Sequence, residues 1–351
     1  MSVAIVPTIR VAEATRVLEE IYTKEDPIGA KFALKHADKV RVSVDTRSGQ
    51  LHEYETFGWG KLVERSRLRF VKFVSRFEFL GKFLLIRYSK MSRDIKRLRA
   101  SHQALEIIYT YAWKKTKGSN MLDRVVTHLN QRFFISNCKA VRNRLKLVRN
   151  EVKRAILALG RNFGKKEITI VSLGAGSARA IIEVLAELMW LHYPLRFTVI
   201  LVDISKSALR YSERLAEEFG IADSVNWIRV CGLLEEFIKN THDHRPDIIE
   251  MVGVMDYFDK IASLDAISQI YDILNPQGTL ITCNVRDNPE KLFLDRVLEW
   301  PMTYREPEEL AEIMLSSGFD GQDVDIIYEP LLIHGVVVAR KVPRLIKTKA
   351  Y

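Results

Sequence analysis

The chain has 351 residues, 47% of them hydrophobic, and a formal net charge of +10. This composition predicts a substantial buried core, in one large domain plus a smaller one. No apolar run reaches the roughly 18 to 20 residues that span a bilayer, and Met1–Thr8 is too short for a signal peptide. Cys138, Cys231 and Cys283 lack the paired spacing of zinc or redox motifs, which predicts no metal site and fits a reducing compartment. We therefore expect a cytoplasmic protein.

The charge is divided unevenly along the chain. Residues 61–166 hold 28 Lys/Arg against 6 Asp/Glu, a net charge of +22, while residues 1–60 carry −1 and residues 167–351 carry −11. Because opposite charges attract, we expect part of the basic segment to pack across the acidic half. A nucleic acid that binds residues 61–166 is an alternative explanation of the same charge.

The first 60 residues contain a helix pattern and a strand pattern. Val11–Tyr22 has apolar residues at helical spacing and is followed by the helix-breaking pair Asp26-Pro27. Val40–Asp45 alternates with period two, and Leu51–Phe57 follows after a polar turn. These patterns predict a helix and then a small β-hairpin at residues 40–57.

The basic segment from residue 60 to 160 is predicted to be largely helical. In Arg65–Ile86, one helical face is apolar and cations repeat on another; the apolar face consists of Phe70, Phe73, Val74, Phe77 and Leu84. We expect the aromatic face to belong to the core and to dock this segment on the rest of the chain. A helix of this kind can also lie on a membrane surface, so peripheral membrane contact is a second interpretation.

The following helix, Asn137–Leu159, leads directly into the second half of the chain. Arg142 and Arg144 on it could reach a carboxylate or could lie exposed to solvent. We predict a mainly helical basic domain at residues 1–160 and a second domain at residues 161–351.

The stretch Glu167–Ser177 is an apolar strand that ends in two glycines and leads into helical sequence. Gly174 and Gly176 allow a tight turn and a close approach of the backbone to a ligand. A second apolar strand, Phe197–Asp203, ends in an acid that could accept hydrogen bonds from ribose hydroxyls. Together the two strands predict a nucleoside-binding site.

The third position of the glycine pattern bears on the kind of nucleoside. A dinucleotide fingerprint requires Gly or Ala there, so that helix and strand pack closely beside a pyrophosphate. Counted from Gly174 and Gly176, that position is Arg179. A bulky cation fits this role poorly, which favours S-adenosylmethionine over a dinucleotide.

The second half of the chain repeats strand and helix in a fixed order. The strands Val225–Cys231, Pro246–Val254 and Thr279–Asn284 alternate with helical patterns, which predicts a parallel sheet with helices on both faces. Asp323–Tyr328 and Leu331–Arg340 are close enough in sequence to form an antiparallel hairpin. We therefore expect an α/β, Rossmann-like sheet that ends in an antiparallel hairpin.

From about Glu167 to the C-terminus, these motifs resemble the class I S-adenosylmethionine-dependent methyltransferases. The glycine loop is similar to motif I of that family, Asp203 matches its acidic strand residue, and Leu274–Gly278 matches its Pro-Gly-Gly-like turn. Three positions depart from the family pattern: Ser172 replaces an acid near the cofactor's amino group, Ala178 replaces the third glycine, and Leu233 replaces an acid that binds adenine.

The resemblance implies that a set of loop and strand-end residues contacts the cofactor. This set is Gly174, Ala175, Gly176, Ser177, Asp203, Ile204, Cys231, Gly232, Leu233, Met251 and Gly253. By the same resemblance, the end of the fourth strand faces the transferable methyl group.

Methyl transfer requires a nucleophile in line with the methyl group and a general base only if the acceptor must lose a proton. The candidate catalytic residues are Asp256 and Tyr257, and His334 is a further polar candidate. Asn284 and Tyr304 are candidate substrate contacts.

The segments Arg286–Pro289 and Leu298–Arg305 also resemble, less specifically, bacterial small-molecule methyltransferases that include makers of hydroxy-fatty-acid methyl esters. That likeness suggests a carboxylate or lipid-like acceptor.

Three functions remain open from the sequence. The first is methyl transfer to a small molecule, with the N-terminal domain as a lid or docking module. The second is RNA methylation with RNA bound by the basic segment, although no Asn-Pro-Pro-Tyr-like sequence follows the fourth strand. The third is a cofactor-binding scaffold without catalysis, because Ser172 and Leu233 each replace a usual ligand.

Overall fold

The computed structural model describes residues 9–10, 40–45, 54–56, 61–111, 120–131, 135–240 and 245–343. The helix expected at Val11–Tyr22 lies outside these residues. In this part of the chain, no helix is both long and apolar enough to cross a membrane.

A nine-stranded sheet forms the centre of the protein, in the order β1-β2-β8-β9-β7-β6-β3-β4-β5. Its strands are β1 (Ile9–Arg10), β2 (Arg41–Val44), β3 (Glu167–Leu173), β4 (Arg196–Asp203), β5 (Asn226–Cys231), β6 (Ile248–Met251), β7 (Thr279–Val285), β8 (Val324–Tyr328) and β9 (His334–Arg340). Strands β3 to β7 pair in parallel, whereas β9 is antiparallel to both β7 and β8. The expected Rossmann-like sheet with a terminal antiparallel hairpin is confirmed.

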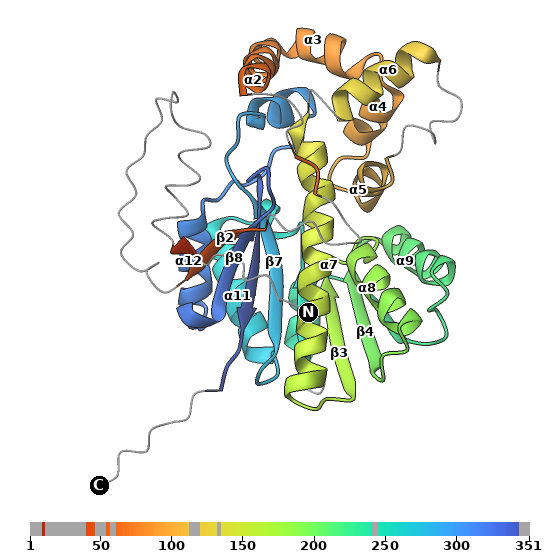
Figure 1. Cartoon of the computed structure of the whole chain (residues 1–351), viewed down its shortest axis with the longest axis vertical. Coiled ribbons are helices and arrows are strands. Elements are labelled where there is room, and N and C mark those ends of the chain that lie inside the picture. Colours follow the sequence, from red (N-terminus) through yellow and green to blue (C-terminus); the bar gives the residue numbers. More distant parts are fainter. Residues whose placement is uncertain are drawn as a thin grey trace.

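Helices cover both faces of the sheet (Figure 1). One face carries α7 (Ser136–Asn162), α8 (Arg179–Trp190) and α9 (Lys206–Glu218), and the other carries α10 (Leu234–Asn240), α11 (Lys260–Ile273) and α12 (Pro307–Ser316). Strand β3 is buried on both faces, which is why its sequence is almost continuously apolar. Ile168 and Ile170 pack in the core beneath α7, α8 and α9, and Val171 and Leu173 pack in the core beneath α10, α11 and α12.

A helical cap covers one end of the sheet (Figure 1). It consists of α2 (Lys61–Arg76), α3 (Glu78–Gly81), the π-helix η2 (Lys82–Ile86), α4 (Lys90–Arg97), α5 (His102–Tyr109) and α6 (Met121–Leu129). Its core joins Val71, Val74 and Leu85 to Phe293 and Val297 of the π-helix η6 (Phe293–Val297). The cap is therefore anchored on a segment that follows β7, far along the chain.

The apolar face expected on α2 docks only in part. Phe70, Phe73 and Phe77 are 38%, 55% and 56% exposed, whereas Val74 of the same face and the neighbouring Val71 are buried. At 100° per residue, Val74 lies about 40° and Val71 about 100° from Phe70, on the side away from Phe73. One edge of a broad apolar face therefore contacts the protein, and the larger side chains on its other edge stay exposed.

The hairpin expected at residues 40–57 differs from the structure in its described part. Strand β2 pairs antiparallel with β1 and in parallel with β8, so it extends the main sheet. Residues 54–56 form no strand: the Tyr54 hydroxyl donates to Asp45 at 3.0 Å, and the Glu55 amide donates to Asn143 of α7 at 2.8 Å. A four-residue strand can pair with any free edge, and here it pairs with β8.

Candidate active site

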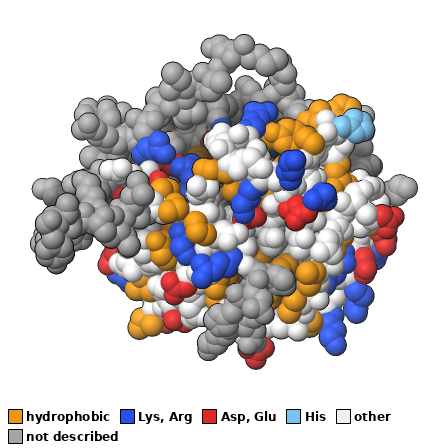
Figure 2. Space-filling view, turned by 90° about the horizontal axis from the view of Figure 1, so that it is seen from below, with side chains coloured by type: hydrophobic (Ala, Val, Ile, Leu, Met, Phe, Trp, Pro, Cys, Tyr) orange, Lys and Arg blue, Asp and Glu red, His pale blue; other side chains and the backbone are white. Residues whose placement is uncertain are grey.

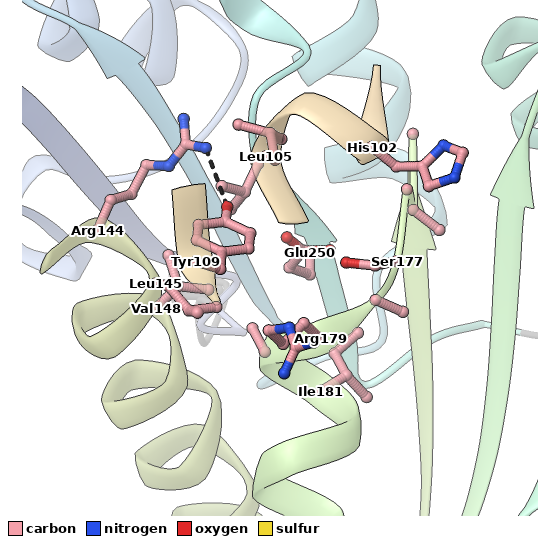
Figure 3. Close-up of a pocket in the computed structure, with 16 residues that line it drawn as sticks. His102, Leu105, Tyr109, Arg144, Leu145, Val148, Ser177, Arg179, Ile181 and Glu250 are labelled. Atoms are coloured by element: carbon pink, nitrogen blue, oxygen red, sulfur yellow. Dashed lines mark hydrogen bonds between the residues drawn. The ribbon is translucent and has the colours of Figure 1, made fainter. Parts of the chain in front are cut away.

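Two cavities adjoin where β3 and β6 end beneath the cap. The first encloses about 520 Å³, part of it open to solvent, between the glycine loop, α5 and α7 (Figure 3). The second has a volume of about 640 Å³, part of it open to solvent, between α4, α5, α7 and the segment around η6. Leu105 and Arg144 line both cavities.

The glycine loop forms the floor of the first cavity. Gly174 and Gly176 have φ of +66° and +53°, and a Cβ added to Gly174 would collide with Val254. Ala178, just before α8, also adopts the left-handed conformation, with φ of +50°. Together with Ala175 and Ser177, these residues line the cavity. The loop therefore presents backbone close to any ligand there, as the sequence predicted for its glycines.

Five further residues expected to contact the cofactor lie beside the first cavity rather than in its wall. Asp203 at the end of β4 pairs with Cys231 at the end of β5. The Asp203 carboxylate accepts from the Gly176 amide at 2.8 Å and from the Ser205 amide at 2.7 Å. Ile204 and Leu233 are 72% and 51% exposed, and Gly232 follows β5 directly. These residues form an open shelf next to the loop.

On strand β6, Glu250 lies in the cavity wall, whereas the sequence predicted that Met251 contacts the cofactor. Side chains alternate along a strand, so Glu250 and Val252 line the first cavity while Met251 is buried in the core on the other face. Gly253 lines the second cavity. The period-two pattern of β6 could have identified Glu250, because Glu250 shares a face of the strand with the buried Ile248.

Glu250 is a buried acid with few hydrogen-bond donors. Its carboxyl accepts a hydrogen bond from the Ser172 hydroxyl. Burial raises its pKa to about 7, although that hydrogen bond and the Arg144 charge act in the opposite direction. Figure 3 shows the carboxyl lying between Tyr109 and Ser177 in the cavity.

The cap closes over the glycine loop through α5, which the sequence analysis did not single out. His102, Leu105 and Tyr109 line the first cavity from this helix. Its Glu106 accepts from Arg179 of α8 at 2.6 Å and from the Tyr211 hydroxyl at 3.0 Å. In this contact an acid of the basic segment binds a cation of the acidic half. The expected charge pairing is present elsewhere: Arg67 of α2 pairs with Glu290 at 2.6 Å, and Lys96 of α4 pairs with Glu299 at 2.8 Å.

The second cavity has apolar walls and one polar end. The apolar walls come from the cap, α7 and the segment around η6: Ile95, Leu105, Ile108, Ile135, Cys138, Val141, Leu294, Leu298, Trp300 and Met302. The polar end consists of Asn137, Arg144, Asp256, Tyr257 and His334.

The polar end holds a cation and a neutral imidazole. Arg144 donates to the Tyr109 hydroxyl at 3.2 Å and lies 3.9 Å from Asp256 Oδ2. His334 is buried, and neither ring nitrogen has a hydrogen-bond partner among the described residues. Burial, with a smaller contribution from Arg144, holds the pKa of His334 well below its usual value. Its imidazole is therefore neutral at pH 7 and a weaker base than in water.

Both predicted catalytic residues line this cavity. Asp256 Oδ1 accepts from the Val285 amide at 2.8 Å, and burial raises the pKa of its carboxyl. The Tyr257 hydroxyl accepts from Trp300 Nε1 at 2.7 Å, and burial raises its pKa. Both groups favour their neutral forms more than they would in water.

The two predicted substrate contacts line neither cavity. Asn284 is fully buried, accepts from Arg305 at 2.5 Å and donates to the Thr303 carbonyl at 2.7 Å. The Tyr304 hydroxyl donates to Asp295 at 3.1 Å. These bonds give both residues a bracing role on the loop after η6. Of the two candidate arginines, Arg142 pairs with Glu55, and only Arg144 reaches the cavities.

Comparison with known proteins identifies the family. Residues 95–341, more than half of the chain, match the model of a family described as "Putative methyltransferase". The chain therefore belongs to this methyltransferase family. Its strand order and terminal hairpin are those expected of the class I methyltransferase fold.

Solved structures with a similar fold share little sequence with the chain. A protein of Bordetella parapertussis described as a possible exported protein has a TM-score of 0.58 at 15% identity, covering 80% of this chain and 97% of that chain. Magnesium protoporphyrin IX methyltransferase of Synechocystis PCC 6803 has a TM-score of 0.46 at 12% identity, covering 74% and 99%. No curated protein sequence matches the chain.

Proposed function

We propose that the protein transfers the methyl group of S-adenosylmethionine to a small, largely apolar acceptor, with the helical cap as a lid. The observation that carries this proposal is the contact between the two cavities, which share Leu105 and Arg144 as walls. A donor in one cavity and an acceptor in the other would meet at this common wall, and proximity accounts for much of the rate of a transfer reaction.

The first cavity fits the cofactor. Gly174–Ser177 would bring backbone against it, Glu250 offers a buried carboxyl to its positive charge, and the shelf at Asp203, Ile204 and Cys231–Leu233 would support the nucleoside. When bound, S-adenosylmethionine supplies an electrophilic methyl group on a positively charged sulfur.

The second cavity suggests what the acceptor looks like. Its apolar walls would hold a hydrocarbon or aromatic body, and Arg144 at the polar end would bind an oxygen that carries negative charge. A carboxylate or phenolate acceptor needs no general base, which suits this site because the lowered pKa of His334 makes its imidazole a weak base. In this proposal Asp256 and Tyr257 position Arg144 and Trp300 around the reacting oxygen.

Methyl transfer from labelled S-adenosylmethionine to fractions of a cell extract tests the proposed reaction. We expect the label in small molecules that partition into organic solvent. Label in RNA would instead support the RNA methyltransferase, and tight cofactor binding without any transfer would support the scaffold. Calorimetry that detects NAD but not S-adenosylmethionine would overturn the proposal.

The lid role can be tested at the contact between α5 and α8. Glu106→Gln weakens the bonds to Arg179 and Tyr211, so we expect about fivefold weaker S-adenosylhomocysteine binding. Glu183→Gln is the matched control, because Glu183 also pairs with Arg179 but lies on α8 itself. Equal effects of the two substitutions would contradict a lid held by α5.

The exposed face of α2 favours a second role, contact with an anionic membrane surface. Phe73 on α2 and Phe77 directly after it have rings 5.4 Å apart, and Phe79 on α3 is 82% exposed; exposed cations of α2 precede them in the chain. Aromatic side chains beside Lys and Arg suit a layer of anionic lipid headgroups. The opposite end of the molecule instead mixes basic and acidic side chains (Figure 2).

Flotation with phosphatidylcholine vesicles, with and without phosphatidylglycerol, tests this second role. We expect binding only to the anionic vesicles, and its loss in the variant Phe73→Ser/Phe77→Ser/Phe79→Ser. Trp190→Ser is the matched control, because Trp190 is 79% exposed at the end of α8. Salt-dependent RNA binding without vesicle binding would contradict the membrane role.

A further inference from the structure

We propose that Glu250 binds the ammonium group at the methionine end of S-adenosylmethionine, and that β6 rather than β3 supplies this carboxylate. The inference rests on the proposed function. The sequence around the glycine loop offers no carboxylate for this ammonium group, because the residue at position 172, next to that loop, is a serine.

The pairing of β3 and β6 places the two side chains together. Ser172 and Glu250 are direct partners in this parallel pair, so both side chains project from the same face of the sheet. Ser172 is fully buried and donates its hydroxyl to the Glu250 carboxyl. The small serine leaves space for the longer side chain, which reaches the cavity wall beside Gly174.

Neighbouring groups of the protein balance the negative charge of the Glu250 carboxylate only in part. Its hydrogen bonds come from the Ser172 hydroxyl and the Val252 backbone, and Arg144 of α7 is the charged group that acts on it. Other acids nearby are already engaged: Asp203 accepts two backbone amides, and Glu106 binds Arg179. A buried carboxylate without a close cation is costly, so a cationic ligand is strongly favoured at this position.

This arrangement predicts a link between binding and protons. Because the pKa of Glu250 is raised to about 7, a large fraction of the free protein carries a neutral carboxyl near that pH. A bound ammonium group favours the ionised form and would lower that pKa. Binding therefore releases protons, and affinity rises as pH increases through about 7.

Calorimetry with two ligands tests the assignment. S-adenosylhomocysteine carries the ammonium group, whereas 5′-methylthioadenosine lacks it. For Glu250→Gln we expect about 10- to 100-fold weaker binding of the first ligand and unchanged binding of the second. Titrations in buffers of different ionisation enthalpy should show proton release with wild type near pH 6.5 and none with Glu250→Gln.

A double variant that moves the carboxylate from β6 to β3 tests whether ligand binding can be restored. In Ser172→Asp/Glu250→Ser the carboxylate moves to β3, and we expect S-adenosylhomocysteine binding to recover at least tenfold over Glu250→Gln. Thermal unfolding of each variant verifies the fold, and the methylthioadenosine titration verifies the site even if one variant is less stable.

The outcomes separate this inference from the proposed function. Wild-type affinity in Glu250→Gln would overturn the role of Glu250 while leaving the methyltransferase intact. An equal loss for both ligands would also overturn it, because the substitution would then have damaged the site in general. Failure of wild type to bind either ligand would overturn the proposed function itself.

Discussion

The two cavities are built in different ways, although they share a wall. The first combines the backbone of the loop from Gly174 to Ser177 with side chains of the cap helix α5 and of α7. The second is formed mainly by apolar side chains from the cap, α7 and the segment around η6. In the proposed function, the donor site is therefore built partly on the sheet, whereas the acceptor site depends mainly on the packing of the cap.

Gly174 is the position where a substitution should weaken binding at the first cavity most. Gly174→Asp should weaken S-adenosylhomocysteine binding more than about 100-fold, because a side chain at φ of +66° is strained and collides with Val254. Calorimetry measures the loss. Gly164→Asp is the matched control, with φ of +63° and open space around its Cβ position. Equal losses for both would show that general strain, and not the site, is responsible.

His334, which lines the second cavity, should make the stability of the folded protein depend on pH. Its pKa is lowered in the folded protein, so protonation favours the unfolded chain and stability falls as pH drops below about 6.5. We expect a loss of up to about 1.4 kcal/mol per pH unit from this residue. Denaturant unfolding at pH 8.0 and 5.5 measures it.

His334→Gln should reduce that dependence without removing it. His102 contributes in the same direction, because burial lowers its pKa as well. Glu250 contributes in the opposite direction over this range: burial raises its pKa to about 7, so its protonation favours the folded protein as pH falls. An unchanged slope in His334→Gln would show that His334 is accessible to protons in the folded state.

A substitution at the cap wall should separate the two cavities. Trp300→Ala removes part of the second cavity and the bond to the Tyr257 hydroxyl, so KM for the acceptor should rise about five- to tenfold. The acceptor purified from the labelled extract serves as substrate. The Kd for S-adenosylhomocysteine should stay within about twofold, and a comparable loss there would break the division between the cavities.

The smallest expected effect concerns the start of α8. Ala178 has φ of +50°, a conformation that glycine adopts without strain. Ala178→Gly should therefore raise the free energy of unfolding by about 0.5 to 1 kcal/mol. Denaturant unfolding measures the change. Destabilisation instead would mean that the methyl group's contacts in the core outweigh the strain.

The sequence predicted the parts of the structure that depend on local patterns. Continuous apolar runs identified the central strands, and the glycine pair identified the loop, because each signal lies within a few residues. The side chain that enters the first cavity from β6 was misplaced by one residue, from Glu250 to Met251. In a strand, that offset exchanges the two faces of the sheet.

The parts that the sequence could not predict depend on partners far along the chain. The docking edge of α2 is decided by η6, more than 200 residues later, and a broad apolar face does not reveal which of its edges contacts a partner. Asn284 was expected to contact substrate, but its side chain is used by Arg305 and Thr303. The position of β2 between β1 and β8 depends likewise on a strand far along the chain.

The wall shared through Leu105 and Arg144 has a consequence for inhibitor design. A single compound that joins an adenosyl group to an apolar body would occupy both cavities at once. Once one half is bound, the other half binds as an intramolecular step at a high effective concentration, so the affinity can exceed that of either half by orders of magnitude. Because the acceptor half would contact cap residues, such a compound would discriminate between methyltransferases that share the same cofactor.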